Sequence, residues 1–158
     1  MPDIEPLPFR LRVPGEDTVD YRGARSISWR IEGLLHLEGD MLVFEWSGVR
    51  KEDRAGVGGV KSVQEELPHE VQNVPVEWIS EVTMGGIWVL PSLILRARRL
   101  DAFEGVPSAR PGYLRLRLRR RDVDCARAML RAIREATELD VFGGRASNSD
   151  PRLGRGET

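Results

Sequence analysis

Arginines in one short stretch are the residues of this chain best suited to hold a charged ligand. In residues 113–121, YLRLRLRRR, arginines alternate with leucines, and a period of two is typical of a strand with one buried face. The arginines then point to solvent, where guanidinium groups bind phosphate or carboxylate groups through paired hydrogen bonds. The candidate anion- or partner-binding set, extended to a nearby segment, is Arg96, Arg98, Arg115, Arg117, Arg119 and Arg121.

The alternative is that these arginines are neutralised by acidic side chains on neighbouring strands. Residues 1–83 contain 16 acidic and 9 basic residues, whereas residues 84–158 contain 9 and 15. Cross-strand pairs with Glu45, Glu77 and Glu81 would therefore absorb the positive charge. Aromatic residues do not interleave with the arginines, as a platform for single-stranded nucleic acid requires, so nucleic acid is not the expected partner.

A second candidate site is the apolar pair Ile87 and Trp88, which lies between Gly86 and Pro91. Core packing would account for both side chains. A tryptophan beside glycine turns is also a typical anchor at a protein–protein interface. We therefore keep Ile87 and Trp88 as a candidate interface.

The sequence offers little for catalysis or metal binding. His36, His69 and Cys125 have no recognisable metal-ligand spacing, and neither a Gly-x-Ser-x-Gly nor a His-Glu-x-x-His motif occurs. The glycine-rich GVGGVKS at 56–62 has Val60 where a phosphate loop needs glycine before the lysine. We expect no catalytic residue, no metal and no cofactor.

Alternating apolar residues predict a mainly β chain. Strands are expected at 25–37 and 41–49, joined by a turn at Gly39, and then at 74–82, 85–90, 93–99, 101–106 and 113–119. From residue 123 the apolar spacing changes to three and four, which predicts one amphipathic helix to residue 139. Short connections favour antiparallel order, and strands with one apolar face must close over a core.

The remaining segments are expected to lack regular structure. Residues 1–23 are rich in proline and predict an extended arm, with a short edge strand possible at Phe9, Leu11 and Val13. Residues 50–73 have three glycines, mixed charges and little periodicity, and predict a long loop. Residues 143–158 predict a disordered tail, which leaves residues 24–142 as the folded domain.

The order of elements resembles the bacterial pleckstrin-homology-like domains, related to the GRAM type. The resemblance covers roughly residues 24–139 and rests on LHLEGDMLVF, VEWISEV and DCARAMLRAIRE. It implies a seven-stranded antiparallel bent sandwich or split barrel, capped at one end by the C-terminal helix. The loop at 50–73 and the proline-rich arm depart from the common pattern of the family.

Three functions follow as hypotheses. The resemblance implies a non-enzymatic binding or assembly module that makes protein contacts, often with further copies of itself. The arginine-rich sheet face suggests peripheral binding to a membrane or another polyanion, lost at high salt. The third is a small enzyme of unrecognised type, which requires a concave pocket of polar residues. The N-terminus has no signal-peptide pattern, and no segment reaches the apolar length of a membrane span, so a cytoplasmic location is expected.

Overall fold

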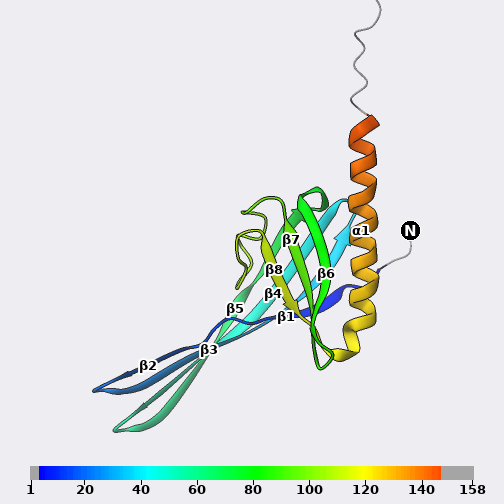
Figure 1. Cartoon of the computed structure of the whole chain (residues 1–158). Coiled ribbons are helices and arrows are strands. Elements are labelled where there is room, and N and C mark those ends of the chain that lie inside the picture. Colours follow the sequence, from blue (N-terminus) through cyan, green and yellow to red (C-terminus); the bar gives the residue numbers. More distant parts are fainter. Residues whose placement is uncertain (1–3, 147–158) are drawn as a thin grey trace, which may run out of the picture.

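The computed structural model describes residues 4–146 and confirms a mainly β fold with one C-terminal helix (Figure 1). Two short 3-10 helices, η1 (Val76–Trp78) and η2 (Arg120–Asp122), precede β6 and the helix. The strands and the helix are β1 (Leu7–Leu11), β2 (Glu16–Asp20), β3 (Gly23–Glu38), β4 (Met41–Gly56), β5 (Gly59–Pro75), β6 (Ile79–Ile87), β7 (Leu90–Ala97), β8 (Tyr113–Arg117) and α1 (Val123–Ala146).

The strands form one open antiparallel sheet in the order β5-β4-β3-β1-β8-β7-β6, with β2 added to β3. The sheet bends around a core, and α1 lies along its open side, where it contacts β6, β1 and β3 (Figure 1). Inward side chains such as Leu35, Phe44 and Leu116 are fully buried, and Met129 and Ile133 of α1 complete the core. This architecture matches the expected sandwich or split barrel capped by a helix, but the sheet has eight strands rather than the expected seven.

β1 corrects the expectation of an extended arm with an edge strand. It lies between β3 and β8, so it joins the two halves of the sheet. Leu7, Phe9 and Leu11 are buried and belong to the core. Five alternating residues look the same at an edge and in the interior, and β8 follows about a hundred residues later, so local pattern alone did not reveal the second partner.

The predicted loop at 50–73 is wrong: these residues continue β4 and form nearly all of β5. The two strands pair from Met41↔Pro75 to Gly56↔Gly59, with a two-residue turn at Val57-Gly58. Most of their side chains in this region are exposed on both faces of the sheet. Since neither face is buried, the apolar alternation that normally marks a strand is missing.

Three smaller elements also differ. Residues 76–78 of the predicted strand 74–82 are the helix η1. The predicted strand 85–90 is interrupted: Gly85 and Gly86 belong to the end of β6, and the β6–β7 turn falls at Trp88-Val89. Residues 101–106 form consecutive turns rather than a strand, although Phe103 is buried and packs edge-on against Phe44.

The helix continues beyond its expected end at residue 139, to Ala146. Residues 143–146 of the predicted disordered tail are therefore helical. The rest of that tail, residues 147–158, lies outside the described residues.

Candidate functional site

Strand β8 presents the predicted arginines on the outer face of the sheet. Leu114 and Leu116 are fully buried, so Arg115 and Arg117 between and after them point outward, as the alternation predicted. Arg117 pairs across the strands with Ser92 of β7. The Nε of Arg115 donates a hydrogen bond to the buried Ser92 Oγ at 3.1 Å. This contact fixes the Nε side of the Arg115 guanidinium and gives the buried Ser92 hydroxyl a hydrogen-bond partner.

β1 brings a further arginine to this surface that the sequence analysis missed. Arg10 lies directly opposite Arg117 in the β1–β8 pairing, and directly opposed like charges destabilise a sheet. The carboxylate of Glu32 lies 3.5 Å from Arg10 and 3.7 Å from Arg119. One carboxylate thus lies within ion-pair distance of both arginines. We call Arg10, Arg115, Arg117 and Arg119 the arginine face.

The other predicted arginines divide between the two interpretations. Arg96 follows the alternative of neutralisation, because it lies 3.5 Å from Glu81 and stacks on Tyr113. Arg98 follows the end of β7 and is exposed, far along the strand from the β6–β7 turn. Arg121 is exposed in η2. Among the side chains that the structure describes, no carboxylate lies within 4.0 Å of Arg115, Arg117 or Arg121.

The predicted interface pair lies at the tip of the β6–β7 hairpin. Ile87 pairs with Leu90, which leaves Trp88 and Val89 as the turn. These four consecutive residues are between 50% and 68% exposed, so they are not core residues. We call Ile87–Leu90 the Trp88 loop.

Local backbone geometry projects the Trp88 loop from the sheet. Gly86 has φ +79°, and a Cβ atom there would lie 2.2 Å from the carbonyl oxygen of Leu90. Only glycine satisfies both constraints. The guanidinium of Arg120 lies 4.2 Å from the centre of the Trp88 ring, a cation–π contact that holds the ring beside η2.

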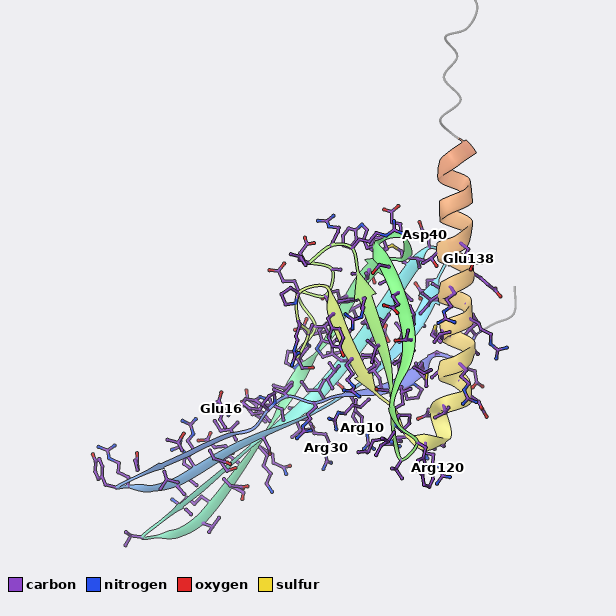
Figure 2. The ribbon with its side chains drawn as sticks, in the orientation of Figure 1. Arg10, Glu16, Arg30, Asp40, Arg120 and Glu138 are labelled. Atoms are coloured by element: carbon purple, nitrogen blue, oxygen red, sulfur yellow. The ribbon has the colours of Figure 1, made fainter. Side chains whose placement is uncertain are left out.

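The Trp88 loop and the arginine face form one continuous surface. A hollow of about 220 Å³ between them is lined by Ile87, Leu90, Ser92, Arg115 and Arg117. Figure 2 shows Arg10 and Arg120 along the same lower side of the body, near the base of α1. The short β6–β7 hairpin and the β7–β8 pairing therefore unite two candidate sites that looked separate in the sequence.

A second hollow of about 360 Å³ continues this surface across the outer face of the sheet. It is lined by Arg10, Glu32, Glu45, His69 and Arg117, among others. It is the concave polar site that the enzyme hypothesis requires. Two of its acids are engaged: Glu32 lies between two arginines, and Glu45 lies 3.7 Å from the imidazole of His36. The third, Asp122, has a buried carboxylate oxygen, Oδ2, with no hydrogen-bond partner among the described atoms.

Cys125 behaves as a structural residue in the first turn of α1. Its thiol lies 3.6 Å from the carbonyl oxygen of Glu5. Burial raises the pKa of this thiol, and the nearby charges of Glu5 and Asp122 raise it further. At neutral pH the sulfur is thus a protonated thiol rather than a nucleophilic thiolate.

No group of three or more His, Cys, Asp or Glu side chains comes together at metal-binding distance in the part of the chain that the structure describes. The helices within residues 4–146 do not combine the length and apolarity that crossing a bilayer requires. Comparison with protein-family models, with curated proteins and with solved structures gives no match for this chain.

Proposed function

We propose that this chain is a non-enzymatic binding module of the pleckstrin-homology-like type that docks on anionic membrane surfaces. The Trp88 loop enters the lipid interface, and the arginine face contacts the phosphate and carboxylate groups of the lipid heads. The observation that carries the proposal is the exposed run Ile87–Leu90 lying directly beside unpaired arginines.

The apolar part supplies a large share of the binding free energy. Full burial of a large apolar side chain contributes about 1.5–3 kcal/mol. Since the side chains of the Trp88 loop are half to two thirds exposed, their transfer into the lipid interface contributes roughly 4–7 kcal/mol in total. Trp88 suits this role, because the amphipathic indole ring prefers the level of the head groups.

The arginines add an electrostatic contribution that depends on the lipid. Each arginine near an anionic leaflet contributes about 1 kcal/mol, and this attraction falls off within a Debye length of about 8 Å at physiological salt. Arg115, Arg117 and Arg120 lie close enough to the Trp88 loop to act together with it. The expected result is reversible binding that requires both anionic lipid and the apolar loop.

The same surface fits the other charged partners less well. A nucleic acid would use the arginines but would leave the four apolar side chains of the loop in water. A membrane covers both parts at once.

Sedimentation with vesicles tests this proposal. The full chain is mixed with vesicles of phosphatidylcholine, alone or with phosphatidylserine, at low and at physiological salt. We expect binding only with phosphatidylserine, weakened at higher salt. Arg115→Glu combined with Arg117→Glu is expected to abolish binding, and Trp88→Ala to weaken it about tenfold or more, which corresponds to about 1.4 kcal/mol.

Two matched variants serve as controls. Arg98→Glu reverses an exposed arginine at the far end of β7, and Tyr21→Ala removes an exposed aromatic ring from the β2–β3 turn. Both are expected to bind like the original chain. Equal binding to vesicles with and without phosphatidylserine contradicts the proposal. So does binding to a duplex oligonucleotide that is lost in the arginine variant and retained in Trp88→Ala, because that result assigns the surface to nucleic acid.

A further inference from the structure

Part of the sheet projects well beyond the core. Residues 16–28 of β2 and β3 and residues 49–66 of β4 and β5 form a four-stranded extension, which we call the finger (Figure 1). Most finger side chains are exposed on both faces. The proposed membrane site uses none of these residues, so the finger needs its own explanation.

The finger is stabilised by ion pairs rather than by a hydrophobic core. Glu52 is only 9% exposed and accepts Nε of Arg25 at 2.6 Å and Nε of Arg54 at 2.7 Å. The hydrogen bond from Arg54, followed by that from Arg25, holds the pKa of Glu52 below its ordinary value. The finger is therefore an ordered structure whose charges are arranged in a definite register.

The finger ends in a free strand edge. β5 is the last strand in the sheet order and pairs with β4 alone among the described strands. Because Gly56 and Gly59 close a two-residue turn, they exchange backbone hydrogen bonds, and so does every second pair after them. The residues whose backbone groups point away from β4, to the free edge, are Val60, Ser62, Gln64 and Glu66.

Charge is unbalanced on this edge. Arg25, Arg54 and Lys61 lie side by side in one row across β3, β4 and β5. Glu52 contacts the two arginines. No carboxylate among the described side chains lies within 4.0 Å of Lys61. Val63 and Glu65 follow Lys61 on the same face of β5, and Val63 is exposed. On the side toward β4, Glu65 lies 4.0 Å from Arg50.

We propose that two copies of this chain associate through the β5 edges of their fingers, antiparallel, with Val63 on the twofold axis. In this register Val63 of each copy faces Val63 of the other. Lys61 of each copy faces Glu65 of the other. Each Lys61 therefore gains a carboxylate partner, and the dimer contains two such pairs. Ser62 and Gln64, whose backbone groups point outward, face each other and exchange hydrogen bonds.

Other registers that also let the outward backbone groups of the two β5 strands bond to each other place less favourable side chains opposite one another. A shift in one direction sets Lys61 against Val63, and a further step sets Lys61 against Lys61. A shift in the other direction sets Val63 against Glu65, and then Glu65 against Glu65. Like charges directly opposed across a ladder destabilise it. The sequence of the edge thus selects one self-complementary contact, as a closed twofold dimer requires.

Charge reversal with rescue tests this dimer. In sedimentation velocity, the full chain is expected to form a dimer at micromolar to tens of micromolar concentration. Lys61→Glu or Glu65→Lys alone creates two like-charge contacts per dimer and is expected to raise the dimer Kd about tenfold. The double variant exchanges the charges and is expected to restore the original Kd. A monomeric original chain, or a double variant no tighter than either single variant, overturns the proposal.

A crosslink tests the register itself. In a Cys125→Ser background, Val63→Cys places two thiols across a close, non-hydrogen-bonded pair, a geometry that permits a disulfide. Mild oxidation is expected to yield a covalent dimer. Val60→Cys, which is somewhat more exposed than Val63 but lies opposite Glu66, is expected to yield little. Similar crosslinking of both variants contradicts the register.

A third variant blocks the edge without disturbing β4. Gln64→Pro removes an outward backbone N–H, which the β4–β5 ladder does not use, and is expected to abolish the dimer while thermal unfolding changes little. Dimerisation that survives this change refutes the edge contact. Trp88→Ala is expected to leave the dimer intact, so this proposal and the membrane proposal fail independently.

Discussion

Replacing Phe9 by alanine tests the position of β1 between the two halves of the sheet. Phe9 is 2% exposed, packs edge-on against Phe44 with the ring centres 6.4 Å apart, and covers Gly33. A Cβ atom at Gly33 would lie 2.6 Å from the Phe9 ring, so the backbone of β3 approaches the ring too closely for any larger residue. Removal of the ring leaves a cavity between the backbone of β3 and the ring of Phe44.

The expected loss follows from these contacts. A buried Phe→Ala change lowers the free energy of unfolding by about 3–5 kcal/mol, and most domains have only about 5–15 kcal/mol in total. With a urea m-value of about 2 kcal/mol/M, the midpoint of unfolding should fall by roughly 1.5–2.5 M. Val19→Ala on the exposed β2 strand is the matched control and should change stability by less than about 0.5 kcal/mol.

Equilibrium urea unfolding followed by circular dichroism provides the measurement. A loss below about 1 kcal/mol for Phe9→Ala would refute the reasoning, because only a peripheral arm tolerates removal of such a side chain. It would return residues 1–23 to the extended arm that the sequence suggested.

Three further predictions concern single groups. The pKa of Glu52 is lowered in the folded state, so its contribution to stability is present above the ordinary glutamate pKa of about 4.3 and is lost as pH falls through the folded value. The difference in thermal midpoint between the original chain and Glu52→Gln should therefore be present at pH 7 and vanish in acid; a difference independent of pH argues against this. The raised pKa of Cys125 should make its reaction with a disulfide reagent at pH 8 slower in the folded chain than in urea, and equal rates would contradict its partial burial. Gly86→Ala should destabilise the chain more than Gly39→Ala, since both positions have positive φ but only the first meets a backbone oxygen; equal losses in urea unfolding would rule out the close approach to Leu90.

The alternation of apolar and polar residues correctly predicted the strands and the helix that have one buried and one solvent-exposed face. Leu114 and Leu116 alternate with arginines, and the structure buries the leucines and exposes the arginines. The helix stripe containing Met129 and Ile133 was found in the same way. The finger was missed because both of its faces are in water, so its residues carry no apolar alternation to detect.

The candidate site was only partly accessible from sequence. Its arginines and Trp88 were identified singly, since residue type and local spacing suffice for that. Their adjacency depends on the β7–β8 pairing, in which Ser92 faces Arg117. Arg10 joins them through a contact between strands about a hundred residues apart. Such long-range pairing leaves no trace in local periodicity.

Quenching of tryptophan fluorescence by brominated lipid tests the membrane proposal most directly. Bromine atoms on the acyl chains next to the head groups quench an indole ring at the lipid interface, where Trp88, the exposed tryptophan of the loop, is proposed to lie. The account predicts quenching when the chain binds vesicles of phosphatidylserine and brominated phosphatidylcholine, and loss of that quenching in Trp88→Phe. Vesicle-bound protein without quenching, or with quenching that persists in Trp88→Phe, would contradict it.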